Sequence, residues 1–134
     1  MARLGEIVFD AMLPARLARF WAAALETYEV RLYDAVEVAR LASLGFTPET
    51  DPCVAIDGDG PTIFFQKSDR MTLDRNRVHL DLECSDLEKE IQRLMALGAL
   101  VREHHDSHTV LLDPEGNQFC LQVNKALSSP ASTS

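Results

Sequence analysis

Hydrophobic and polar residues alternate with a period of two in several stretches of the chain. The clearest stretch runs from Val78 to Cys84, where His79, Asp81 and Glu83 separate the apolar residues. In a strand, successive side chains point to opposite faces of the sheet. The pattern therefore predicts a strand with one apolar face and one face that carries two carboxylates and an imidazole.

Similar alternation predicts seven further strands. Ile7 and Phe9 share the apolar face of the first strand, and Val30 and Leu32 are expected to face the core from the second. Gly58-Asp59-Gly60 is typical of a hairpin turn between the third and fourth. The predicted strands cover 6–10, 28–33, 53–57, 62–67, 100–103, 109–112 and a last segment that ends at 123.

Apolar residues at helical spacing predict two helices in the first half of the chain. Pro14 suits the first turn of a helix, and an apolar stripe follows it at Leu17, Phe20, Trp21, Ala24 and Leu25. A short extra helix is predicted near 35–45. Its apolar stripe consists of Val38, Leu41 and Ala42, and it ends at Gly45.

A third helix is predicted in the second half. Ser85 and Glu88 have the spacing of a capping box, with Ser85 at the N-cap position. Gly98 suits a helix end that takes the left-handed conformation. Between them, Leu87, Ile91, Leu94 and Met95 form the apolar stripe.

The order of predicted elements repeats once along the chain. Residues 5–68 and 76–123 each read strand, helix and three strands, with a polar linker between them. We predict an α+β fold in which two βαβββ modules form a curved mixed sheet around a cleft, with the helices outside. The modules form a single domain over 1–124, and 125–134 is a flexible tail.

Composition and charge narrow the function classes. The chain has 134 residues, a formal net charge of −8 and three cysteines without metal-ligand spacing. Nucleic-acid binding depends on lysine and arginine, so such an acidic chain is not expected to bind nucleic acid. We see neither a signal peptide nor an apolar run that spans a membrane, and we expect reduced thiols in a cytoplasmic protein.

Two segments resemble the vicinal oxygen chelate superfamily, and within it the small glyoxalase-like and bleomycin-resistance-like proteins common in actinobacteria. They are 76–82 (Asn-Arg-Val-His-Leu-Asp-Leu) and 113–121 (Asp-Pro-Glu-Gly-Asn-Gln-Phe-Cys-Leu), with support from 17–21 and 62–66. The resemblance implies the glyoxalase/bleomycin resistance/dihydroxybiphenyl dioxygenase fold and a homodimer. It does not imply one activity, because lyases, dioxygenases, epimerases and drug-binding proteins share this fold.

The resemblance also implies where a divalent metal would bind. Its first-strand position falls on Glu6, and the imidazole that opens the second half is His79. Gln66 matches a weaker oxygen ligand in the first half. The fourth position, a glutamate in metal-dependent members, is Cys120, and a neutral thiol does not bind metal until it ionises. The cofactor is therefore either none or a divalent metal.

The polar sides of the strands predict the wall of a ligand-binding cleft. Several carboxylates on one wall repel each other, which a cationic ligand would relieve. The alternative, that these acids lie in water at the strand ends, stays open. The predicted wall consists of Glu6, Asp10, Phe64, Gln66, His79, Asp81, Gln118 and Cys120, with Val8, Glu83 and Gln122 on the same side.

Two other groups of residues have a chemical and a structural interpretation. His104, His105, Asp106 and His108 have the composition of a metal site, but their place in a predicted turn favours a solvated loop. Cys120 as a nucleophile would need an adjacent base, and a small buried thiol is the favoured interpretation. We assign no catalytic residue.

Three functions remain open. The favoured one is a binding protein that sequesters or senses a cationic or aromatic small molecule. The second is a lyase, isomerase or dioxygenase in which a divalent metal on Glu6 and His79 acts as a Lewis acid. The third is a structural or interaction module whose own side chains fill the cleft.

Overall fold

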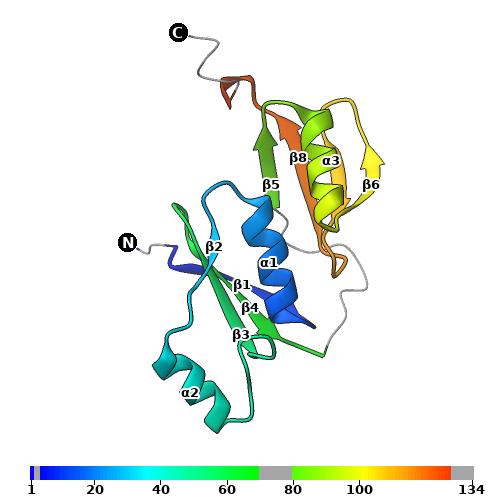
Figure 1. Cartoon of the computed structure of the whole chain (residues 1–134). Helices are drawn as coiled ribbons and strands as arrows, with labels where there is room; N and C mark the ends of the chain where they lie inside the picture. The colour runs from blue at the N-terminus through cyan, green and yellow to red at the C-terminus, as the bar shows by residue number, and fades with distance from the viewer. Residues whose placement is uncertain (2–3, 70–79, 128–134) are drawn as a thin grey trace. The chain divides into compact units, whose positions relative to one another are not determined.

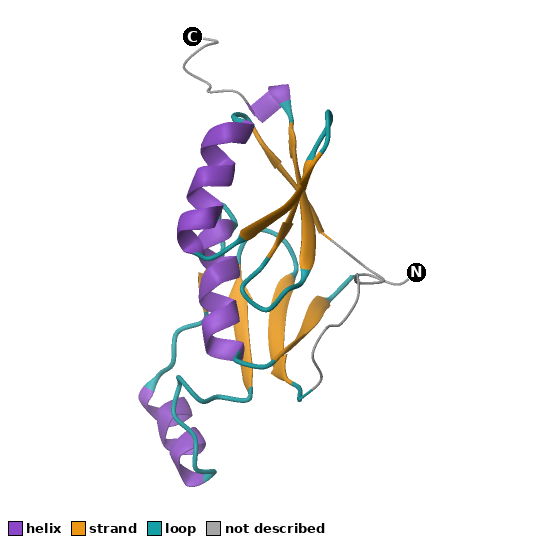
Figure 2. Cartoon of the chain, turned by 90° about the vertical axis from the view of Figure 1, so that its right-hand side faces the viewer, coloured by secondary structure: helices purple, strands orange, loops and turns teal. Residues whose placement is uncertain are grey.

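The computed structural model describes Met1, residues 4–69 and residues 80–127 (Figure 1). The chain divides into two compact units, Met1–Met71 and Thr72–Ser134. Each unit contains a four-stranded mixed sheet with one helix on one of its faces (Figures 1 and 2). The predicted α+β fold with two copies of a βαβββ pattern is confirmed.

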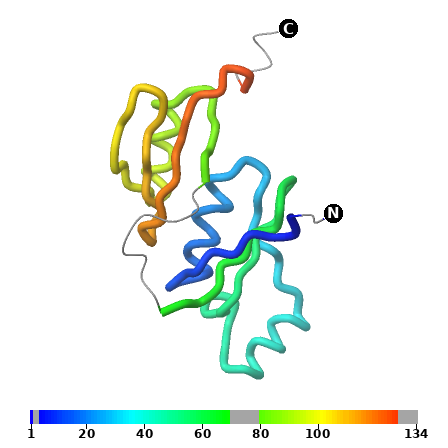
Figure 3. Tube along the Cα trace, turned by 180° about the vertical axis from the view of Figure 1, so that it is seen from behind, coloured from blue at the N-terminus to red at the C-terminus, as the bar shows by residue number. Residues whose placement is uncertain are grey.

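Unit one has the strand order β1-β4-β3-β2. The first strand pairs with the last in parallel, and the other pairs are antiparallel. The traces of β1 and β4 run side by side in Figure 3. The elements are β1 Glu6–Ala11, α1 Pro14–Ala24, β2 Glu29–Val30, α2 Ala35–Ser43, β3 Cys53–Asp57 and β4 Thr62–Lys67.

The core of unit one lies between α1 and its sheet. Trp21 is 1% exposed, and its ring meets Phe9 at a centroid distance of 5.6 Å. Phe9 in turn lies 5.4 Å from the buried ring of Phe65. Pro14 stands in the first turn of α1, as predicted. The face of β1 that carries Ile7 and Phe9 is therefore the one that α1 covers.

Two predictions for unit one are wrong. The second strand covers only Glu29–Val30, and Leu32 is 94% exposed instead of facing the core. Alternation predicts which face a residue takes but not whether a partner strand continues beside it. In α2 the predicted stripe residues Val38 and Ala42 are exposed and only Leu41 is buried. That helix therefore packs through a single residue.

Unit two repeats the arrangement with the strand order β5-β8-β7-β6. Again the first and last strands pair in parallel. Its core contains Ile91 and Leu94 of the helix against Leu111, Phe119 and Leu121 of the sheet. The elements are β5 Leu80–Cys84, α3 Leu87–Leu97, β6 Leu100–His104, β7 Thr109–Leu112, β8 Gln118–Val123 and a 3-10 turn at Lys125–Leu127.

The start of α3 differs from its prediction. Asp86 is the N-cap residue, and its carboxylate accepts a hydrogen bond from the Lys89 backbone N–H at 3.2 Å. Serine and aspartate cap helices about equally well, so the sequence could not decide between Ser85 and Asp86. Met95 is 44% exposed and does not belong to the buried stripe. Gly98 ends the helix at φ +120°, as predicted.

Three predictions lie wholly or largely outside the described residues. They are the strand start at Val78 with His79, most of the linker before 76, and the tail beyond 127. Within the described ranges, no helix is long and apolar enough to cross a membrane.

Candidate functional site

The structure places the predicted site residues that it describes, which are all but His79, on one sheet face in each unit. In unit one, Glu6, Val8 and Asp10 lie on the side of β1 opposite to α1. The register pairs Glu6 with Thr62, Val8 with Phe64 and Asp10 with Gln66. We call this side open face one, and it brings together four predicted residues: Glu6, Asp10, Phe64 and Gln66.

Open face one has an apolar centre. On β3, Ala55 pairs with Phe64, which itself pairs with Val8 on β1. These three side chains therefore form a row across the sheet, with neighbouring strands about 5 Å apart. Val8 is 49% exposed, so the row reaches solvent at its β1 end. Val8 and the partly exposed Phe64 therefore offer an apolar surface to a ligand, whereas Ala55 is only 7% exposed.

Two carboxylates flank that exposed end. Glu6 and Asp10 each stand two residues from Val8, and both are exposed. Within the described ranges, neither has a hydrogen bond or an ion pair. An unpaired carboxylate beside an apolar surface favours a ligand that combines an apolar body with a positive charge.

Arg31 covers the other end of the row. Its guanidinium donates from Nε and Nη2 to the Asp57 carboxylate, at 2.8 Å each, and these hydrogen bonds lower the pKa of Asp57. Its backbone N–H bonds to the Ala55 carbonyl at 2.9 Å. The guanidinium carbon lies 5.6 Å from the centre of the Phe64 ring. Both partners of the ion pair are about half exposed, so it contributes at most about 1 kcal/mol. Its main effect is to hold the Arg31 plane beside Phe64.

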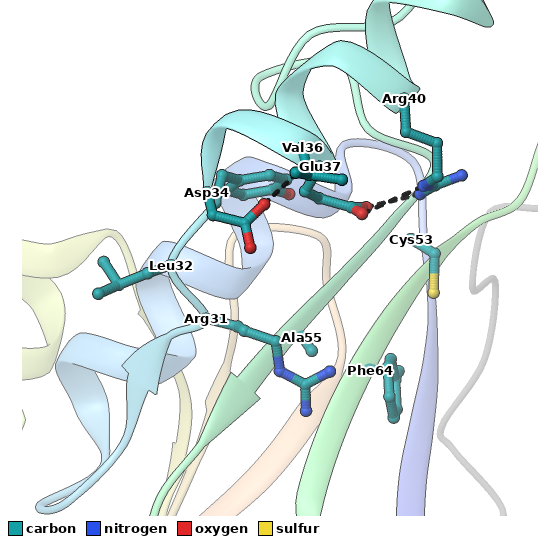
Figure 4. Close-up of a pocket in the computed structure, with 10 residues that line it drawn as sticks. Arg31, Leu32, Asp34, Val36, Glu37, Arg40, Cys53, Ala55 and Phe64 are labelled. Carbon is teal, nitrogen blue, oxygen red and sulfur yellow. Dashed lines mark hydrogen bonds and ion pairs between the residues drawn. The ribbon is translucent and has the colours of Figure 1, made fainter.

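A pocket of about 510 Å³ lies between α2 and open face one. Phe64 and Ala55 form part of its wall on the sheet, and residues of α2 lie across from them (Figure 4). It is lined by Arg31, Leu32, Tyr33, Asp34, Val36, Glu37, Arg40, Cys53, Ala55 and Phe64.

The corresponding face of unit two carries Asp81, Gln118 and Cys120. Asp81 pairs with Cys120 across β5 and β8, and Val110 stands beside Cys120 on β7. Burial raises the pKa of the Cys120 thiol, and the charge of Asp81 and a hydrogen bond with it add to the effect. A thiol held neutral in this way is a poor nucleophile and a poor metal ligand.

Replacing Asp81 by asparagine is expected to lower the pKa of Cys120. More of the thiol is then ionised at pH 8, so iodoacetamide should alkylate Cys120 faster than in the wild type. Mass spectrometry of the Cys120 peptide measures the rate separately from Cys53 and Cys84. Glu83→Gln, two residues along the same strand, is the matched control and should leave the rate unchanged. An unaltered rate in Asp81→Asn would mean that burial alone sets the pKa.

The described residues do not assemble the predicted metal donors. Glu6 pairs with Thr62, whereas Gln66 pairs with Asp10. Because Thr62 and Gln66 are four residues apart on β4, Gln66 lies about 13 Å along the strand from the position opposite Glu6. Glu6 and Gln66 of one sheet are therefore too far apart to bind one ion. His79 lies outside the described residues, and within the described ranges no group of three histidine, cysteine or acidic residues is placed to hold a metal. The predicted metal site on Glu6 and His79 therefore stays a prediction.

The histidine-rich segment forms a turn after β6. The His105 N–H bonds to the His108 carbonyl, and the two rings stack at a centroid distance of 4.7 Å. His104 contacts Thr109 at 3.2 Å, and His105 contacts Glu103 at 3.3 Å. These contacts are local to the hairpin, in keeping with the loop interpretation.

Of the ten residues that line the pocket, sequence reasoning predicted only Phe64, and it missed Arg31, Ala55 and Val36 among others. A signal for Arg31 was present, since alternation placed it opposite to Val30 and so on the polar side of the sheet. Ala55 had no such signal, because Val54, Ala55 and Ile56 are all apolar and all buried. Nothing in the sequence indicated that residues of the extra helix would line a pocket with Ala55 and Phe64.

The comparisons with known proteins agree with this architecture. A family model described as "Glyoxalase-like domain" matches residues 6–122. No curated protein matches the chain.

Solved structures also share the fold. A glyoxalase/bleomycin resistance protein/dioxygenase family enzyme from Burkholderia phytofirmans has 15% identity and a TM-score of 0.67, covering 91% of this chain and 98% of that one. The fosfomycin resistance protein FosX from Mesorhizobium loti has 11% identity and a TM-score of 0.65, covering 99% and 97%. A FosX mutant from Listeria monocytogenes, solved with Mn(II) and a dihydroxypropylphosphonic acid, has 13% identity and a TM-score of 0.64, covering 91% and 90%. Identities this low show the fold alone.

Proposed function

Because this chain belongs to the glyoxalase-like domain family, we propose that it is a small-molecule-binding protein for organic cations with an aromatic or apolar body. The observation that carries the proposal is the composition of open face one. The apolar row of Ala55, Phe64 and Val8 ends between the carboxylates of Glu6 and Asp10, which have no ion-pair partner among the described residues. The row would take the apolar body of the ligand, and the carboxylates would take its charge.

The net charge of −8 supports a cation over an anion as the ligand. We further propose that the protein acts in the cytoplasm, where its three free cysteines stay reduced. By its resemblance to paired family members, it should form a homodimer, which sedimentation equilibrium can test against the chain mass of 14.9 kDa.

Three probes with the same ring system test the proposal by calorimetry: 2-naphthylmethylammonium, neutral 2-naphthylmethanol and anionic 2-naphthoate. The wild type should bind the cation tightest and the anion weakest. Glu6→Gln and Asp10→Asn should each weaken cation binding by about threefold, as expected for one exposed charge pair. Their affinity for the neutral probe should not change.

Glu26→Gln is the control, since it removes an exposed carboxylate just after α1. It should leave all three affinities unchanged. Equal binding of the cation and the anion, or full cation affinity in the double variant of Glu6 and Asp10, would contradict the proposal. So would the absence of binding by every probe.

The alternative of a metal-dependent lyase, isomerase or dioxygenase receives less support from the described residues. Glu6 has Thr62 and not Gln66 opposite it, and burial raises the pKa of the Cys120 thiol. Metal analysis of the purified protein separates the two functions. Stoichiometric Mn(II) or Zn(II) that His79→Ala removes would favour the metal-dependent alternative.

A further inference from the structure

Helix α2 is an addition to the repeated pattern of the two units. Their strand orders correspond one to one, with β2 and β3 of unit one matching β6 and β7 of unit two. The connection between β6 and β7 is the short turn 105–108, whereas the connection between β2 and β3 is 31–52 and contains α2. The pocket beside α2 is therefore lined by a segment that the repeat itself does not require.

The inserted segment is tied to the sheet at several points. The Tyr33 hydroxyl donates to the Asp51 carboxylate at 2.6 Å, and the other oxygen of Asp51 accepts from the Cys53 backbone N–H at 2.9 Å. Asp51 is 6% exposed, and Leu41 of the helix is 1% exposed. Asp34 caps α2 by accepting from the Glu37 N–H at 2.8 Å. These contacts hold the pocket wall in place before a ligand arrives, which lowers the entropic cost of binding.

Three of the four charged residues that line the pocket are in ion pairs, and the fourth, Asp34, caps α2. Arg40 donates two hydrogen bonds to Glu37, the shorter at 2.6 Å, and Arg31 is paired with Asp57. Figure 4 shows the Arg40–Glu37 pair and the side chains of Ala55 and Phe64. With three of these charges in ion pairs and part of its wall apolar, the pocket favours an uncharged part of a ligand over an ionic one.

We propose that the pocket between α2 and β3–β4 binds the planar aromatic part of the ligand, with the Arg31 guanidinium and the Phe64 ring as its stacking surfaces. The inference rests on the proposed function. Asp57 occupies one edge of the guanidinium and the Phe64 ring lies against one side of it, so a ligand ring would stack on the side that remains. A volume of about 510 Å³ suits a fused ring system. The ligand's positive group then points along the row toward Val8, where Glu6 and Asp10 lie.

The test compares 2-naphthylmethylammonium with its saturated, non-planar counterpart, decahydro-2-naphthylmethylammonium. Both carry the same charge, so a preference for the first measures planar stacking. The wild type should bind the planar amine about fivefold tighter. Ala55→Leu, which fills the pocket, should weaken its binding at least tenfold. Ala23→Leu on the exposed side of α1 is the matched control and should have no effect.

A second measurement needs no variant and so does not depend on how Ala55→Leu folds. Nuclear Overhauser contacts from the naphthyl protons of the bound amine should reach the methyl groups of Val36 and Ala55. If both amines bind equally and the contacts reach Val8 but neither Val36 nor Ala55, the pocket inference is overturned while the proposed function stands. If neither amine binds, both fail.

Discussion

Replacing Asp113 by alanine is expected to lower the free energy of unfolding by about 3 kcal/mol. Asp113 is 2% exposed, and its carboxylate accepts three hydrogen bonds in the turn before β8. The donors are the backbone N–H groups of Glu115 and Asn117 at 2.9 Å and the Asn117 side-chain amide at 2.8 Å. Alanine would leave these donors without their acceptor in a site that water does not easily reach.

Urea unfolding followed by far-UV circular dichroism measures this change. Asp106→Ala is the control, because that aspartate lies exposed in the other turn of unit two. It should change stability by no more than about 0.5 kcal/mol. A loss below about 1 kcal/mol in Asp113→Ala would contradict the prediction and mean that water replaces the carboxylate.

Alternation predicted the two faces of β1 and β8 correctly. Ile7 and Phe9 face α1, while Glu6, Val8 and Asp10 face away from it. This works because one face of each sheet is buried, so a shift by one residue would expose the whole apolar set.

The helix and strand boundaries that were predicted wrongly are not constrained by a buried face in this way. Glu29–Val30 is a two-residue edge strand; beyond it the Arg31 N–H still bonds to the Ala55 carbonyl, but Leu32 is 94% exposed. At the start of α3, Ser85 and Asp86 are both good N-cap residues, and only the backbone geometry selects Asp86.

The site was harder to predict than the fold because it depends on register and on distant pairs. The sequence placed Glu6 and Gln66 on the same face, but only the pairing of β1 with β4 shows that they lie four residues apart. Arg31 and Asp57 are 26 residues apart in sequence and meet through the pairing of β2 with β3. The pocket beside α2 is likewise lined by residues that are distant in sequence and come together only in the folded chain.

Phe64 and Phe65 are neighbours on β4 that point to opposite faces of the same sheet. Phe65 is fully buried and lies 5.4 Å from Phe9, whereas Phe64 is partly exposed on open face one. Because the two positions share a residue type and a strand, they form a matched pair. The alanine variants of these two residues therefore separate the contribution to stability from the proposed contribution to ligand binding.

Phe65→Ala should lower the free energy of unfolding by about 4 kcal/mol, because it removes a large ring from a packed core and leaves a cavity. Phe64→Ala should cost about 1 kcal/mol, and it should abolish the preference for planar over saturated naphthyl amine. Urea unfolding followed by the fluorescence of Trp21, the chain's single tryptophan, measures the first effect, and calorimetry measures the second. Equal costs for the two variants would contradict the placement of Phe65 in the core. If Phe64→Ala still preferred the planar amine to the saturated one, the Phe64 ring would not be one of the stacking surfaces that bind the ligand.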